Sequence, residues 1–393
     1  MSGAAYLAWR YLLHHRIKTL ILVLSIALIV FLPIGLRVLV RQSAAQLTAR
    51  AEATPLVLGA RGSALELVLA SLYFDAEPPP SIAYAEATRV DESSLAEAIP
   101  LHLGFRTRDK PIVGTTLEYF ELRGLHVAAG RMLAVLGECV VGARAAAELG
   151  VGPGDALVSS PETVFQLAGV YPLKMRVAGV LAPSHTPDDG AVFVDLKTAW
   201  IIAGLGHGHR DLADAKAQTD VAAREGGRIT AKASVVEYNE ITPENAASFH
   251  FHGEQAELPI SAILARPRDA KARALLLGRY QAPDEPIQVL RPTAVMDELL
   301  ETVVTVESYA VAAVGAVGVA TLATAGLVFL LSIRLRRREI ETLVKIGGSR
   351  ASVATVLLSE VVGVTLLGIL LASVLTLITS RFGEAAIRRF LLS

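Results

Sequence analysis

Two His-x-His pairs are the residues whose types and spacing are best suited to chemistry in this sequence. They are His207-x-His209 and His250-x-His252. Alternate residues of a β-strand point to the same face, so each pair can offer two imidazole nitrogens to one metal ion. Four such nitrogens would suit zinc or copper. The alternative is that they are ordinary polar loop or packing histidines, and convergence of the two pairs would decide between these interpretations.

The sequence motifs of several common enzyme classes are absent. The chain has no G-x-x-x-x-G-K-[ST] and no Gly-Lys pair, so it cannot hold nucleotide phosphates in the manner of a P-loop. It also lacks the G-x-S-x-G nucleophile elbow and the H-E-x-x-H motif. Apart from the candidate zinc site, we therefore expect no bound cofactor and no enzymatic activity, with any ATP chemistry on a partner.

The segment from Arg334 to Glu360 combines dense basic charge with an apolar stripe and lies between two long apolar runs. Gly347-Gly348 should break a short amphipathic helix, and Ser349 can cap the helix that follows. Such a helix suits a groove on another protein, although the basic charge alone would also serve as a topological anchor. The apolar stripe is formed by Ile340, Leu343, Val344 and Ile346.

The same segment resembles the loop between the second and third spans of the FtsX and MacB superfamily of ABC transporter permeases. In that family, an R-x-R-E-I pattern and a later glycine precede a glutamate at the start of the third span. The resemblance implies a coupling helix that contacts a separate ATPase subunit, which would carry ATP and magnesium. The matching residues are Arg336, Arg338, Glu339, Ile340, Lys345, Gly347, Gly348, Ser349 and Glu360.

The composition indicates a membrane protein with a large polar part. The 393 residues are 52% hydrophobic and 19% charged, and the mean hydropathy is +0.47. A net charge of −1 gives no global field that would attract nucleic acid. The single cysteine, Cys139, excludes an intrachain disulfide.

Three uncharged apolar runs are long enough to cross a bilayer. We expect an amphipathic helix at 1–18, spans at 19–40, 308–333 and 351–380, a cytoplasmic coupling loop at 334–350, and an amphipathic tail at 381–393 on the outer leaflet. The sequence leaves no room for the fourth span that is usual in the resembled family. A cleaved signal peptide is the alternative for the first run, but that run is too long and Ala49-Arg50-Ala51 lies too far beyond it.

Small residues recur along two of the predicted spans. Spacing of four residues lets another helix approach closely, although an alanine-rich span without such a partner would have the same pattern. With the family resemblance, this pattern predicts a dimer with a second permease copy or a paralogue. The residues are Ala312, Ala316, Ala320, Thr324, Gly368 and Ala372.

Residues 41–307 have the short alternating elements of an α+β domain outside the cytoplasm. An inserted block at about 114–202 resembles the MacB-type periplasmic core domain. It contains G-T-x-x-x-Y-F from Gly114, the pair Gly130-Arg131, the glycine-rich turn that ends at Asp155, and V-x-G-V-L from Val177. We therefore predict α-helical spans with a large α+β domain made of two β-α-β-containing subdomains.

The resemblance implies a permease subunit of the bacterial inner membrane that works by mechanotransmission. ATP hydrolysis on a partner would move the periplasmic domain and so extract or export a lipoprotein, lipid or peptide. Partners would include a periplasmic lipoprotein or membrane-fusion protein, besides membrane lipid. The alternatives are an FtsX-like regulator of a cell-wall hydrolase and, from the histidines, a metal-handling permease.

Overall fold

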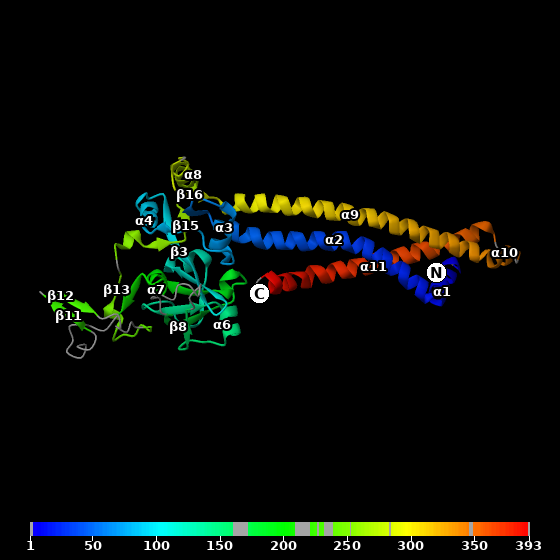
Figure 1. Cartoon of the computed structure of the whole chain (residues 1–393). Helices are drawn as coiled ribbons and strands as arrows, with labels where there is room; N and C mark the ends of the chain where they lie inside the picture. The colour runs from blue at the N-terminus through cyan, green and yellow to red at the C-terminus, as the bar shows by residue number, and fades with distance from the viewer. Residues whose placement is uncertain are drawn as a thin grey trace. The chain divides into compact units, whose positions relative to one another are not determined.

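The chain divides into two compact units in a computed structural model (Figure 1). The first unit comprises Met1–Leu47 and Glu298–Ser393, and the second comprises Thr48–Asp297. The residues that the structure describes are 3–159, 172–208, 221–225, 228–231, 239–251, 253–282, 284–345 and 349–391. Each unit is built on its own core.

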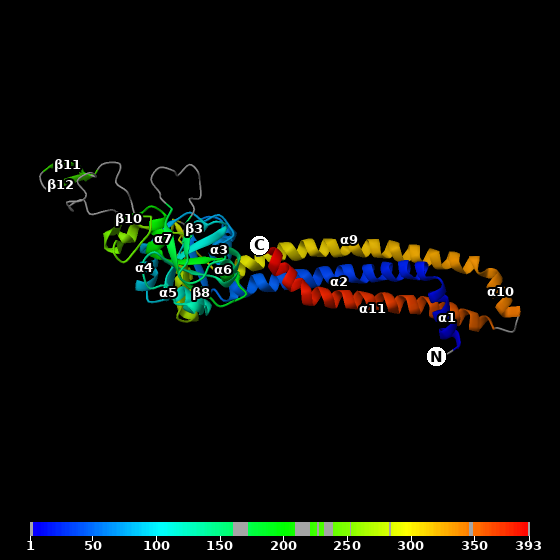
Figure 2. The same cartoon turned by 90° about the horizontal axis from the view of Figure 1, so that it is seen from below.

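Long helices dominate the first unit. They are α1 (Gly3–His14), α2 (Arg16–Glu52), α9 (Pro292–Leu335), the short α10 (Arg337–Lys345) and α11 (Arg350–Leu391). In both views α2, α9 and α11 lie side by side (Figures 1 and 2). Among the described residues, three segments are long and apolar enough to cross a membrane: Arg16–Gln42, Pro292–Leu335 and Ala351–Gly383. The prediction of three spans is confirmed on that basis.

The helices of this unit meet through small residues and aliphatic side chains. A Cβ added to Gly368 would lie 2.6 Å from the side chain of Ile26, so only glycine lets α11 approach α2 this closely. One turn further along α11, Ala372 is buried. The core of the unit is formed by Leu12, Leu22 and Val364.

The two ends of the predicted membrane region differ in detail from the sequence interpretation. At the amino-terminal end, the helix is interrupted at His15, between α1 and α2 and within the predicted amphipathic segment. At the other end, α11 continues without interruption to Leu391, so residues 381–391 belong to the last long helix and form no separate one. Residues 381–391 contain no proline that would interrupt the helix.

The second unit contains a ten-stranded mixed sheet among its described residues. Of the strand pairs described in this sheet, β4–β9 and β6–β8 are parallel and the others are antiparallel. The strand order is β16 (Ile287–Leu290), β1 (Leu56–Ala60), β15 (Ala262–Pro267), β3 (Ala96–Thr107), β4 (Lys110–Thr115), β9 (Val192–Asp195), β6 (Glu138–Val141), β8 (Lys174–Leu181) and β5 (Val127–Gly130), with β7 (Ala156–Val158) also on β8. The large predicted domain of mixed helices and strands is therefore present, and its sheet is mixed.

Strand β3 connects the two predicted halves of the domain. Its first part, up to Leu101, pairs with β15, and its second part, from His102, pairs with β4. Each half has its own hydrophobic core. One surrounds Trp200, whose indole Nε1 donates to the Pro259 carbonyl at 2.7 Å, and the other surrounds Met175.

Helices and small ribbons complete the second unit. The helices are α3 (Ala64–Tyr73), α4 (Ala85–Glu92), α5 (Leu117–Arg123), α6 (Ala143–Leu149), α7 (Leu196–Ile202) and α8 (Ala270–Arg279). The ribbons are β10 (Gly206–Gly208) with β13 (Phe249–Phe251), β14 (Pro259–Ile260) with β2 (Ile82–Ala83), and β11 (Val221–Glu225) with β12 (Arg228–Ala231). The ribbon formed by β10 and β13 packs against the core around Trp200, where the rings of Phe251 and Trp200 have centroids 6.1 Å apart.

Several residues of the sequence motifs hold turns and buried charges in place. Arg131 donates two hydrogen bonds to the carboxylate of Glu138, at 2.7 and 2.5 Å, and Arg176 donates a third at 2.6 Å. Burial by itself raises the pKa of Glu138, but these hydrogen bonds outweigh it and lower the pKa to about 2. In the glycine-rich turn, Asp155 accepts a hydrogen bond from the backbone of Gly152 at 2.8 Å. The motif residues Arg131 and Asp155 therefore have a structural role in the folded domain.

Candidate functional site

The junction between α9 and α10 is fixed by a charged cluster inside the first unit. Arg336 stands between the two helices and donates from Nη1 to both carboxylate oxygens of Glu360, at 3.0 and 3.2 Å. The Arg336 Cζ atom lies 3.7 Å from the centroid of the Tyr11 ring. Glu360 is 4% exposed. The cluster therefore holds α1, α11 and the start of α10 together.

Lys18 adds a second cation to this cluster. Its Nζ donates to Ser332 Oγ at 2.5 Å and lies 5.5 Å from the centroid of the Phe329 ring. The same Nζ lies 5.8 Å from the Tyr11 ring centroid. Lys18 and Arg336 thus both lie near the ring of Tyr11, and Arg336 pairs with Glu360.

Of the residues predicted to contact an ATPase, the structure brings Arg336 and Glu360 together within the chain. Their side chains face each other, so they position α10 rather than line an outer docking surface. Ser349 lies at the start of α11, where its Oγ accepts from the backbone of Ser352 at 3.1 Å, as a helix cap.

The remaining predicted coupling residues lie on or beyond α10. Ile340 is half-buried, Arg338 and Lys345 are exposed, and Val344 is 41% exposed. Glu339 and Leu343 are part of the helix, but their side chains are not among those described, and residues 346–348, which include Ile346, Gly347 and Gly348, lie outside the described residues. In the described part, α10 offers Ile340 and Val344 on one face, with the exposed ion pair Arg337–Glu341 (3.1 Å) beside it.

The small-residue stripe of α9 is exposed within this chain. Ala312, Ala316, Ala320 and Thr324 are exposed. In contrast, α9 contacts α2 through Gly318, where an added Cβ would lie 3.0 Å from Ile29. The stripe therefore faces away from the helices of its own chain. Gly368 and Ala372, in contrast, lie within the packing of α11 against α2.

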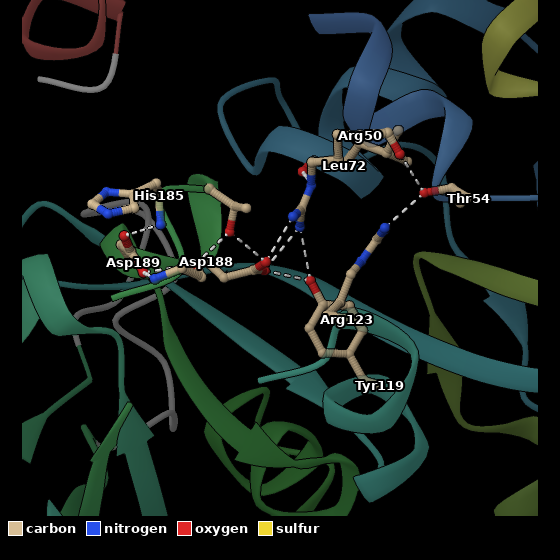
Figure 3. Close-up of polar contacts among 10 residues, drawn as sticks. Arg50, Thr54, Leu72, Tyr119, Arg123, His185, Asp188 and Asp189 are labelled. Atoms are coloured by element: carbon tan, nitrogen blue, oxygen red, sulfur yellow. Dashed lines mark hydrogen bonds and ion pairs between the residues drawn. The ribbon is translucent and has the colours of Figure 1, made fainter. Parts of the chain in front are cut away.

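A buried ion pair in the second unit is a feature that sequence reasoning missed. Arg50, in the last turn of α2, donates to both oxygens of Asp188, from Nη1 at 2.6 Å and from Nη2 at 2.8 Å (Figure 3). Arg50 Nη2 also donates to the hydroxyl of Tyr119 at 2.9 Å, and Nε donates to the carbonyl of Leu72. Arg50 and Asp188 are 6% and 1% exposed in their side chains. The end of α2 is thus fastened to α3, α5 and the 3₁₀ turn Pro187–Gly190 (η2).

Both charges of this pair persist because each stabilises the other. Burial alone would lower the pKa of Arg50, but Asp188 and Tyr119 outweigh burial and hold that pKa above its usual value. Burial opposes the charge of Asp188 too, yet Arg50 keeps the pKa of Asp188 below its usual value. Both members of the pair are therefore charged near neutral pH.

A second layer of hydrogen bonds supports the ion pair (Figure 3). The Tyr119 hydroxyl donates to Asp188 Oδ1 at 2.6 Å, and the Thr186 hydroxyl donates to Oδ2 at 2.9 Å. Arg123 Nη1 donates to Thr54 Oγ1 at 2.8 Å, and that hydroxyl donates to the carbonyl of Arg50 at 2.9 Å. We call Arg50, Asp188, Tyr119, Thr186 and Leu72 the α2 clamp.

The predicted metal ligands are partly within the described residues. His207 of β10 lies opposite His250 of β13, and their ring centroids are 4.9 Å apart. His209 and His252 lie outside the described residues. Across the part of the chain that the structure describes, no group of three or more histidine, cysteine or acidic side chains is placed to hold a metal ion.

Comparison with known proteins places the chain in a family. A model of the MacB-like periplasmic core domain matches residues 19–237, which is more than half of the 393 residues. The chain belongs to this family. It is a permease of the FtsX and MacB type, from ABC transporters, and the resemblance seen in the sequence is confirmed. No curated protein sequence matches the chain.

Two solved structures are similar to this MacB-type chain. The periplasmic region of MacB from Actinobacillus actinomycetemcomitans is 10% identical with a TM-score of 0.36, over 64% of this chain and 97% of that one. The extracellular domain of the noncanonic ABC-type transporter YknZ from Gram-positive bacteria is 12% identical with a TM-score of 0.33, over 60% and 98% of the two chains.

Proposed function

We propose that this MacB-type permease works by mechanotransmission in the bacterial inner membrane. A separate ATPase subunit binds at α10, and its ATP-driven movement reaches the large domain, which lies in the periplasm. There the domain acts on a lipoprotein, lipid or peptide and so extracts or exports it. The chain itself carries no nucleotide chemistry, in keeping with a sequence that lacks a P-loop.

The observation that carries this proposal is the placement of α10. The helix follows α9 after a single residue, Arg336, and the pair Arg336–Glu360 fixes that junction against α11. A force on α10 therefore acts directly on two long helices. The apolar side chains Ile340 and Val344 on a helix that is otherwise charged suit a groove on a partner.

The α2 clamp supports the proposed transfer of movement to the large domain. The chain passes between the two units through α2 and α9, and α2 is helical from Arg16 to Glu52. At its last turn, Arg50 is fastened by four hydrogen bonds to three elements of the second unit. If the last turn of α2 is displaced, these hydrogen bonds therefore pull the elements of the domain that they hold along with it.

A second permease copy or a paralogue completes the transporter in this proposal. The exposed stripe Ala312, Ala316, Ala320 and Thr324 gives α9 a surface on which another helix can pack closely. Two copies would also match two ATPase subunits, one for each α10. A periplasmic lipoprotein or membrane-fusion protein is the further partner that we propose for the outer domain.

Co-purification of the proposed partner ATPase tests the proposal. Ile340→Asp places a charge on the apolar face of α10, where it is costly to bury against a partner. Thr342→Asp is the matched control, since Thr342 is exposed and lies two residues along the same helix, on its opposite side. We expect ATPase binding to be lost in the first variant and kept in the second, with equal membrane insertion. Binding that survives Ile340→Asp would remove α10 as the docking site.

A further inference from the structure

The ribbon formed by β10 and β13 has two different faces. On one face, the ring of Phe251 covers Gly206 and the ring of Phe249 covers Gly208, so that a Cβ added to either glycine would lie 2.7 or 2.6 Å from the ring. Both phenylalanines are packed against the hydrophobic cores of the second unit. The alternation of a β-strand directs the residues between them to the other face.

That other face carries His207 and His250. The two residues are direct cross-strand partners, and their rings meet edge to face at 72° with centroids 4.9 Å apart. Phenylalanine rings packed over the glycines hold both strands in register, which fixes the imidazoles opposite each other. His250 is exposed and His207 is half-buried, so an ion can reach the pair from solvent.

The tautomer of His250 is set by the backbone. Its Nδ1 lies 3.0 Å from the carbonyl oxygen of Ser248. A carbonyl only accepts, so Nδ1 must carry the proton, and in neutral imidazole the lone pair is then on Nε2. A backbone carbonyl on the far nitrogen is the usual way in which a protein orients a histidine that binds a metal.

We propose that His207 and His250 form a bidentate site for a zinc-class divalent cation on the outer domain. Two imidazole nitrogens at about 2.0–2.1 Å from a shared zinc lie about 3–4 Å apart. With centroids 4.9 Å apart, the His207 ring can turn about χ2 toward Nε2 of His250 while His250 keeps its contact with Ser248. Water completes the coordination, which makes this an open site that can exchange its ion.

The full chain in detergent provides the test, with zinc as the titrant in calorimetry at neutral pH. We expect one saturable site, weakened more than about tenfold by either His207→Ala or His250→Ala, because even loss of an outer-shell partner costs about 10–100-fold in metal affinity. His209 and His252 stay unchanged in every variant. Thermal unfolding without metal should be similar in the wild type and both variants, because the two imidazoles face away from the core.

The pair His14–His15 is the matched control. Its ring centroids are also 4.9 Å apart, but the residues are neighbours on the chain, at the end of α1 and just after it. The variant His14→Ala with His15→Ala should keep the zinc affinity. As a second readout, copper(II) should show an electron paramagnetic resonance spectrum with two nitrogen ligands in the wild type and one in each single variant. Zinc affinity unchanged by both single substitutions, or lost in the control, would overturn the proposal and leave His207 and His250 as a packing pair.

Discussion

Replacing Asp188 with asparagine removes the negative charge of the α2 clamp while keeping nearly the same shape. Asp188 accepts from Arg50 at 2.6 and 2.8 Å, from Tyr119 at 2.6 Å and from Thr186 at 2.9 Å. Without the carboxylate, the guanidinium of Arg50 stays buried and uncompensated. Breaking a buried ion pair in this way costs about 3–5 kcal/mol. For a domain of this size, about 2–4 °C of midpoint per kcal/mol predicts a fall of about 6–20 °C.

The assay is calorimetric unfolding of the full chain in detergent, with the transition of the second unit followed for each variant. The double variant Arg50→Met with Asp188→Leu leaves no uncompensated charge. Its loss of unfolding free energy should be smaller, by about 2 kcal/mol or more, than the sum of the losses in the single variants Arg50→Met and Asp188→Leu. Arg89 and Glu285 form the control, because Arg89 is 40% exposed and their 3.4 Å pair should be worth at most about 1 kcal/mol. A fall below about 2 °C for Asp188→Asn, or strictly additive costs, would refute the clamp.

Two further predictions concern pH and topology. Burial lowers the pKa of His102 from the ordinary 6.5 to about 4, so stability is fully present above pH 6.5 and falls by about 3 kcal/mol as the pH drops to 4. His102→Leu should flatten that part of the urea-midpoint profile, and an equally steep profile in the variant would show that another group is responsible. A reporter fused after Ser393 should lie outside the cytoplasm and one inserted at Gly347-Gly348 inside, whereas a cytoplasmic carboxyl terminus would contradict three spans.

Local sequence signals predicted many of the elements well. The predicted spans 19–40, 308–333 and 351–380 each lie within one long helix, α2, α9 and α11 respectively. Ser349 was predicted to cap the helix that follows Gly347-Gly348, and its Oγ accepts from the backbone of Ser352. Such signals lie within a few residues of the element that they define, so a single sequence contains them.

Contacts between distant residues were not predictable in the same way. Arg50 and Asp188 are 138 residues apart, and the sequence around Arg50 drew attention only as a lookalike of a cleavage site. Arg336 and Glu360 were both predicted as coupling residues, but their pairing depends on how α9 and α11 are rotated about their axes. Rotation is set by tertiary packing, such as that of Gly368 on Ile26, and no local pattern encodes it. The only available signal for the clamp was Tyr119 in the G-T-x-x-x-Y-F motif.

The central claim is that ATP hydrolysis at α10 moves the outer domain, and a distance measured there tests it most directly. Cys139 is fully buried, and burial raises the pKa of its thiol to about 12, so an introduced cysteine will be labelled selectively. Lys271→Cys on the exposed side of α8 would carry a spin label on each permease copy in the complex with its ATPase. We predict that the label-to-label distance changes when a nucleotide analogue traps the ATPase, and that Ile340→Asp abolishes the change. The same distance distribution with and without the trapped nucleotide would contradict mechanotransmission.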